Sequence, residues 1–161
     1  MINYLNDYFA TLKYSTFKKY ASIVSFFSDL IILFYLNNIL ISKYLNKSFL
    51  YNIFLIQGIN LNSLPQHELE NYLSMMRNNV SLIFWIILIY NSIIYLCNIK
   101  GYHWAEKYVR GYVLTGSLLS VIEIVLTLAF SNSINFYTLF SALGYTWVYL
   151  GFRHFKEKVE R

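Results

Sequence analysis

The feature that most constrains this chain is a set of four long stretches that contain no lysine, arginine or proline and only two acidic residues. They cover residues 21–42, 80–98, 112–130 and 134–152. A helix of about 20 mainly apolar residues can cross the hydrocarbon core of a bilayer. We therefore expect an all-α membrane protein, a four-transmembrane-helix bundle that forms a single membrane domain over residues 1–161.

The composition favours a membrane protein over a soluble or nucleic-acid-binding one. Hydrophobic residues make up 57% of the chain and charged residues 13%, against about 25% charged residues in soluble domains. The 13 Lys and Arg outnumber the 8 Asp and Glu, but they flank the apolar stretches. Basic residues in that position are attracted to anionic headgroups. We expect the lipid bilayer to be their partner, and no nucleic acid.

The first 20 residues predict an amphipathic helix ahead of the first span. Apolar residues recur there every three or four positions, at Ile2, Leu5, Phe9 and Leu12, and such a helix lies in the plane of the headgroups. The apolar stretch that follows is too long for the core of a signal peptide, and no cleavage site comes after it. We expect it to stay in the protein as an anchor.

The connection over residues 43–79 is long and has its own predicted structure. Residues 49–59 are apolar but too few to cross a bilayer. Ser63 then reads as an N-cap, with Pro65 in the first turn and Gln66 at the capping-box position. An apolar stripe on the helix that follows is formed by Leu69, Tyr72, Leu73 and Met76.

The other two connections are shorter. Residues 99–111 form a basic connection, and residues 131–133 form a tight turn that predicts an antiparallel hairpin of the last two spans.

Basic residues beside the spans predict the orientation. The N-terminal segment, the 99–111 connection and the C-terminus together hold ten of the 13 Lys and Arg, and only Lys43, Lys47 and Arg77 lie on the opposite side. Cytoplasmic segments carry the excess of Lys and Arg. We expect both termini in the cytoplasm and residues 43–79 outside. The abundance of Asn, Ile, Lys, Tyr and Phe suggests an AT-rich bacterial genome, and hence the inner (plasma) membrane.

Polar residues at membrane depth are the candidate functional residues. At 1.5 Å per residue, Asp29 lies roughly 12 Å into the first span and Glu123 roughly 16 Å into the third. Asn91 and Tyr145 fall near the same level of the second and fourth spans, so we expect an intramembrane polar layer of these four residues. An ionised acid at this depth costs about 2.5–3.5 kcal/mol, and no span supplies a cation to pair with it.

Three states of the two acids remain open. They are protonated, they are hydrogen-bonded to Asn91, Tyr145 or Ser120, or they face water or a bound cation. Two spans also carry small residues that allow another helix to approach closely. These helix-packing positions are Gly116, Ser120, Ser141, Gly144 and Gly151.

Enzyme, metal and cofactor motifs do not occur in the sequence. His67 lies outside while His103 and His154 lie inside, so the three histidines do not converge in the predicted topology. His103 and Glu106 have the spacing of two metal ligands, but a polar turn at the interface explains them better. Cys97 is the only cysteine, which excludes an intrachain disulfide. We expect a non-enzyme with no metal and no cofactor.

Two functional hypotheses follow. The first is a protein that acts by self-association, as a homo-oligomer, or as an accessory or immunity-type partner of another membrane protein. In outline, its architecture is similar to that of bacterial immunity proteins against pore-forming toxins. The alternative is an oligomeric channel or transporter for ions or protons that uses Asp29 and Glu123.

Overall fold

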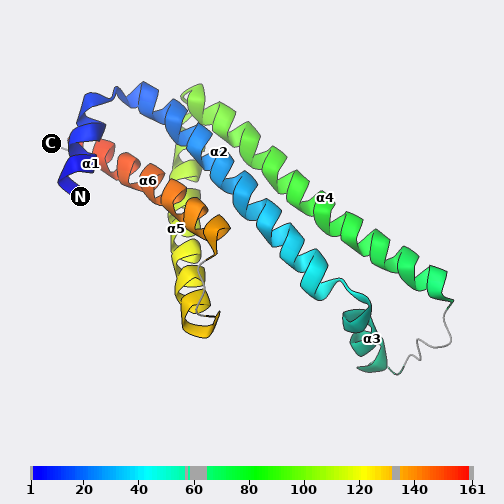
Figure 1. Cartoon of the computed structure of the whole chain (residues 1–161). Helices are drawn as coiled ribbons and strands as arrows, with labels where there is room; N and C mark the ends of the chain where they lie inside the picture. Colours follow the sequence, from blue (N-terminus) through cyan, green and yellow to red (C-terminus); the bar gives the residue numbers. More distant parts are fainter. Residues whose placement is uncertain (1, 57, 59–64, 132–134, 160–161) are drawn as a thin grey trace. The chain divides into compact units, whose positions relative to one another are not determined.

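The computed structural model describes residues 2–56, 58, 65–131 and 135–159, and every regular element in these ranges is a helix. The expected all-helical fold is therefore confirmed for this part of the chain. In order, the elements are α1 (Ile2–Thr11), α2 (Tyr14–Ile39), the π-helical turn η1 (Leu40–Tyr44), α3 (Lys47–Ile56), α4 (Gln66–Ile99), α5 (His103–Ser131) and α6 (Phe136–Val159) (Figure 1).

Three described helical segments are long and apolar enough to cross a membrane. They are Tyr14–Tyr44, Gln66–Ile99 and His103–Phe130. They correspond to the first three predicted spans. The helix that contains the fourth predicted span is α6. It has 24 residues, but its apolar residues alternate with Ser, Thr, Gly, Tyr and Trp. The fourth span therefore stays a prediction.

The helices extend beyond the spans that hydropathy marks. α2 begins at Tyr14, seven residues before the predicted span, and α5 begins at His103 within the expected 99–111 connection. The helix predicted after Pro65 and the second span form one helix of 34 residues, α4. The reason is that polar residues such as Glu, Lys and Arg are good helix formers, so a helix continues into the polar region.

The ends of α4 follow local backbone chemistry. At its start, the carbonyl of Pro65 accepts hydrogen bonds from the amides of Glu68 and Leu69. At its end, Gly101 has a φ of 89°, a conformation that favours glycine. The expected N-cap Ser63 and the expected turn after Ser131 lie outside the described residues.

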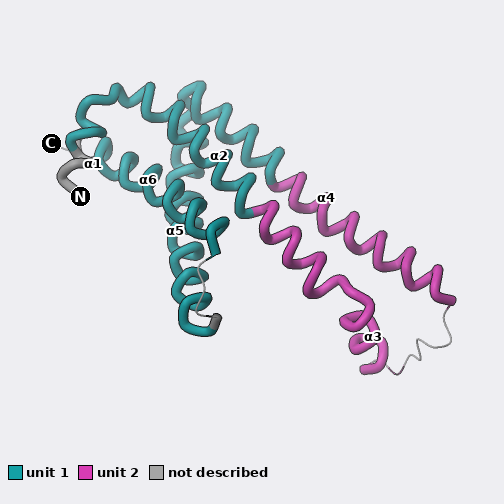
Figure 2. Tube along the Cα trace, in the orientation of Figure 1, with its two compact units in different colours: residues 1–32, 88–161 teal, residues 33–87 magenta. Residues whose placement is uncertain are grey.

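The described chain forms two compact units, residues 1–32 with 88–161 and residues 33–87 (Figure 2). The first unit contains a core of buried aromatic and aliphatic side chains from α1, α2, α4, α5 and α6. The Phe17 ring is fully buried and packs edge-on against Phe152 at 5.2 Å between ring centroids.

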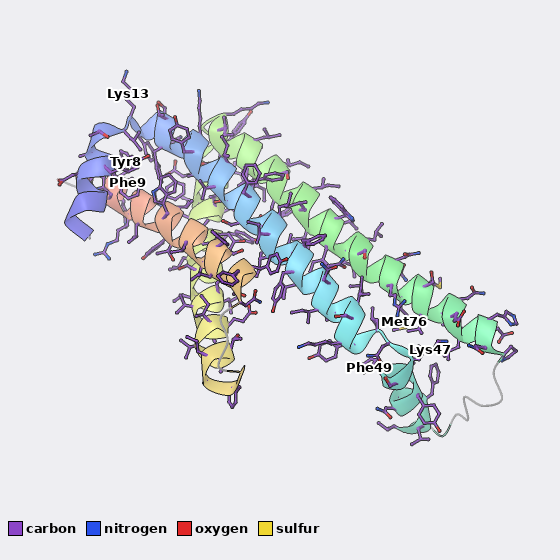
Figure 3. The ribbon with its side chains drawn as sticks, in the orientation of Figure 1. Tyr8, Phe9, Lys13, Lys47, Phe49 and Met76 are labelled. Atoms are coloured by element: carbon purple, nitrogen blue, oxygen red, sulfur yellow. The ribbon has the colours of Figure 1, made fainter. Side chains whose placement is uncertain are left out.

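The first helix packs against this core. Phe9 is 1% exposed and contacts Phe17, Trp147 and His154 with ring centroids 5.6–5.9 Å apart. Figure 3 shows Phe9 on the side of α1 toward α6, whereas Lys13 extends away from the helices. α1 therefore uses at least one of its apolar residues for contacts within the chain.

The second unit combines three buried leucines, Leu45, Leu50 and Leu73, with polar contacts around α3. Arg77 on α4 donates from Nε and Nη2 to the carbonyl of Leu45, at 3.0 and 2.9 Å. The Asn46 side chain caps α3 by accepting the amide of Phe49 at 2.8 Å. Lys47 reaches Glu70 at 2.7 Å, but this ion pair is exposed, so it contributes little.

Two glycines of α6 let side chains from the N-terminal part of the chain approach closely. A Cβ at Gly144 would lie 2.1 Å from Ser28 Oγ, and a Cβ at Gly151 would lie 2.2 Å from Phe17 Cε2. Ser141 on the same side of α6 donates to the carbonyl of Ser28 at 3.2 Å. These small residues of α6 are therefore occupied by contacts within one chain.

We expect Gly144→Ala to destabilise the protein by about 1–3 kcal/mol, because the added methyl group overpacks the contact with Ser28. Ser28→Ala should restore much of this loss, because it removes the oxygen atom that the methyl group meets. Thermal unfolding of the single and double variants in detergent measures both effects.

Gly111→Ala is the matched control, because a Cβ there would meet nothing within 4 Å. An alanine at an open helical position is expected to be neutral or to stabilise by up to about 1 kcal/mol. Equal destabilisation by the two glycine variants, or no rescue by Ser28→Ala, would contradict the close contact between α2 and α6.

Candidate functional site

Asp29 of α2 lies in the interior of the first unit, with 0% of its surface exposed. Its Oδ2 accepts hydrogen bonds from Asn91 Nδ2 at 2.8 Å and from the Tyr95 hydroxyl at 2.7 Å. Its Oδ1 accepts a hydrogen bond from the Tyr145 hydroxyl at 2.6 Å. We call Asp29, Asn91, Tyr95 and Tyr145 the Asp29 cluster. It joins α2 to both α4 and α6.

Helical spacing explains why these groups meet. Asn91 and Tyr95 are four residues apart on α4, so their side chains lie on one face of the helix. α2 and α4 run antiparallel. A second contact lies seven residues before Asp29 on α2 and seven residues after Asn91 on α4, where Asn98 Nδ2 donates to Ser22 Oγ at 2.9 Å. Asp29 therefore faces the polar side of α4.

Further aromatic residues surround the cluster. The Tyr108 hydroxyl donates to Asn91 Oδ1 at 3.3 Å. The Tyr108 ring stacks on Tyr112, and Tyr112 meets Tyr145 edge-on at 6.1 Å. On α5, a Cβ at Gly116 would lie 2.9 Å from the Tyr145 ring. The absence of a side chain at Gly116 leaves room for the ring of Tyr145, which reaches Asp29.

The charge of Asp29 has no cationic counterpart in the described part of the chain. All three donors are neutral, and the ion pairs found there involve other residues. An ionised carboxylate accepts all three bonds. A protonated carboxyl instead donates one bond, and a tyrosine hydroxyl can rotate to accept it. The same four side chains can thus satisfy either protonation state of Asp29.

A second polar cluster lies where α2 and α5 begin. Glu106 accepts a hydrogen bond from the Tyr14 hydroxyl, and it lies 3.6 Å from Lys18 Nζ and 3.1 Å from Arg110 Nη2. The guanidinium of Arg110 also lies over the Phe152 ring. We call Tyr14, Lys18, Glu106 and Arg110 the Glu106 cluster.

These contacts give Glu106 a role in ion pairing, while His103 on the preceding turn is exposed. Among the described residues, no group of three or more His, Cys, Asp or Glu could hold a metal ion.

Glu123 does not belong to the Asp29 cluster. Of the four residues expected to form one polar layer, Asp29, Asn91 and Tyr145 meet directly. Glu123 is only partly buried, and it accepts a hydrogen bond from Thr138 Oγ1 of α6 at 3.3 Å.

The register of α5 and α6 explains this separation. These helices are antiparallel, and Gly116 faces Tyr145. Glu123 and Thr138 each lie seven residues from that pair, which is about 10 Å along a helix. Depth counted from hydropathy borders did not resolve a difference of this size.

Tyr95 is the main site residue that the sequence prediction left out. Its spacing of four residues from Asn91 places both on one helical face, and this signal could have identified it. Aromatic residues near span ends usually lie at the membrane border, so the sequence positions of Tyr108 and Tyr112 do not point to the site. Their approach to Asn91 and Tyr145 depends on the packing of α5, which no local pattern encodes.

Comparisons of the chain with protein-family models, with curated proteins and with solved structures found no match.

We expect Tyr95→Phe and Tyr145→Phe each to lower the free energy of unfolding by about 0.6–1.7 kcal/mol, from the average to the largest value measured for hydrogen bonds between membrane helices. The effect should shrink in an Asp29→Asn background, because the charged acceptor is then gone. Unfolding of the single and double variants in micelles measures this coupling.

Tyr90→Phe is a control on the same helix, since Tyr90 is 57% exposed and should tolerate loss of its hydroxyl. Equal losses with and without the Asp29 carboxylate would show that neither tyrosine is coupled to it.

Proposed function

We propose that this chain is a small multi-pass membrane protein that takes up and releases a proton, or a small cation, at Asp29. The observation that carries the proposal is the fully buried carboxylate with three neutral hydrogen-bond donors and no cationic partner in the described chain. Ionisable groups within membrane helices are costly and typically mark ion or proton pathways.

The energies involved allow both charge states of the site. Inserting the charge costs about 2.5–3.5 kcal/mol on translocon scales. Hydrogen bonds between membrane helices contribute about 0.6 kcal/mol on average and about 1.7 kcal/mol at most, so the three that Asp29 accepts total about 2–5 kcal/mol. The two contributions are similar in size, so modest changes in the surroundings of Asp29 would shift the balance between binding and release.

We further propose four passes across a bacterial inner membrane, with both termini in the cytoplasm and α1 at the headgroup level. Antiparallel contacts support the four passes: α2 runs against α4 at Ser22 and Asn98, and α5 runs against α6 at Glu123 and Thr138. α6 lies beside α2 and α5 over much of its length, which supports a fourth crossing despite its polar residues.

Reporter fusions after residues 60, 105 and 161 test this topology. We expect the first to report outside and the other two to report inside, because basic residues concentrate beside the second and third positions. If residues 60 and 105 report the same side, the four-span topology is wrong.

We expect purified protein in liposomes to carry a proton or monovalent-cation flux that Asp29→Asn reduces to the level of empty vesicles. A pH-sensitive dye reports protons, and a potential-driven assay with Na⁺ or K⁺ reports cations. Glu123→Gln is the matched control, since it removes the charge of the other intramembrane acid. It should retain the flux because Glu123 lies outside the Asp29 cluster.

The position of Glu123 favours a second function. In it, the protein acts by self-association or as an accessory or immunity-type partner of another membrane protein. This acid is only partly buried, and it lies on α5 beside Leu119, Ile122 and Leu126, which are 50–60% exposed. A neighbouring protein would cover this acid better than lipid would.

The liposome experiment separates the two candidates. No flux above empty vesicles, together with a discrete oligomer on native gels that Glu123→Gln dissociates, would contradict the first proposal and support assembly. Flux that depends on Asp29 in a protein that stays monomeric would support the first.

A further inference from the structure

Polar side chains continue from Asp29 toward one end of the first unit. On α2 they are Ser22, Ser25 and Asp29, spaced by three and four residues, and on α4 they are Asn91, Tyr95 and Asn98, spaced by four and three. We call these six residues the polar row. Each of them is at most 3% exposed.

Hydrogen bonds join the two sides of the polar row at both ends but not in the middle. Asp29 bonds to Asn91 and Tyr95, and Asn98 bonds to Ser22. Ser25 lies between these contacts on α2. Its Oγ and the Oδ1 of Asn98 are buried and have no hydrogen-bond partner in the described chain.

Two unpartnered polar atoms in one buried row need an explanation. An unsatisfied buried donor or acceptor costs about 1–3 kcal/mol. Buried water in proteins occupies sites of this kind, where two to four polar groups converge. A serine hydroxyl and an amide oxygen can both bond to the same water molecule, since the hydroxyl donates or accepts and the amide oxygen accepts.

The polar row has a direction. Lys18 lies one helical turn before Ser22 on α2 and belongs to the Glu106 cluster, with both its side chain and that of Glu106 15% exposed. Beyond Asp29 the corresponding positions are apolar, Ile32 on α2 and Leu88 on α4. The polar row thus leads toward the Glu106 cluster and ends at Asp29.

We propose that Ser25 and Asn98 bind water that gives Asp29 access to protons from the end of the unit that carries the Glu106 cluster. This inference rests on the proposed function of Asp29. The step transfers a proton through hydrogen-bonded water to the carboxylate of Asp29. One O–H bond forms at Asp29 as one breaks on the adjoining water, which takes a proton in turn from the next water, and nothing is oxidised or reduced.

Access to water can be measured by cysteine substitution. Cys97 is the only cysteine, so Cys97→Ser gives a background free of thiols. In this background, Ser25→Cys and Asn98→Cys place a thiol on either side of the row. Silver ion is a suitable probe, because it is small, stays in water and binds thiols. Denaturation and maleimide labelling then count the thiols that silver has not blocked.

Two further variants serve as references. Tyr102→Cys marks the end of the unit that carries the Glu106 cluster, because Tyr102 directly precedes α5 and is 52% exposed. Ser120→Cys replaces a serine of α5 that is 5% exposed and lies outside the polar row. We expect silver to block Ser25→Cys and Asn98→Cys at least about tenfold faster than Ser120→Cys, a rate difference of about 1.4 kcal/mol in activation free energy. The blocking should occur from the side that labels Tyr102→Cys.

Thermal unfolding confirms that each variant is folded before labelling. Protection of both row cysteines to the level of Ser120→Cys, or access only from the opposite side, would overturn the proposal. The liposome assay separates this result from the proposed function. If flux depends on Asp29 but the row cysteines are protected from silver, the proposed function of Asp29 is retained and the water route along the polar row is excluded. Accessible row cysteines without flux support a hydrated row and contradict transport.

Discussion

The first unit depends on one hydrogen-bonded group, the carboxylate of Asp29. In a bilayer, lipid tails compete with apolar side chains for every helix face, so hydrophobicity alone gives little preference for helix–helix contact. Polar bonds and close packing must supply that preference. Asp29 accepts bonds from α4 and α6 at once, and Gly144 lets α6 come close to Ser28, the residue before Asp29.

The two acids of the apolar helix segments differ in their surroundings, and this difference separates the functional candidates. Asp29 is enclosed by one chain and needs no partner protein to satisfy its oxygens. A pore between subunits lined by Asp29 is therefore a poorer explanation than a site within the monomer. Glu123 has one bond from Thr138 and lies among exposed leucine and isoleucine side chains. An association surface is the better explanation for that acid.

The sequence predicted the helical class and, with the first three of its four expected spans, the three helices that are long and apolar enough to cross a membrane, because hydropathy and charge are local properties. It also placed Asn91 and Tyr145 near the level of Asp29. It did not separate Glu123 from them, because interhelical register depends on which small residues meet which side chains. Phe9 illustrates the same limit: its spacing predicted an amphipathic helix, but its contacts with Phe17 and Trp147 follow from tertiary packing.

One consequence concerns Gly116. The Tyr145 ring rests against the position where a Cβ at residue 116 would lie, at 2.9 Å, and the hydroxyl on the far end of that ring reaches Asp29 at 2.6 Å. A phenol ring is rigid, so a single added carbon on α5 would tilt it and lengthen the bond at its other end. The size of residue 116 on α5 therefore determines how closely the Tyr145 hydroxyl can approach the carboxylate of Asp29.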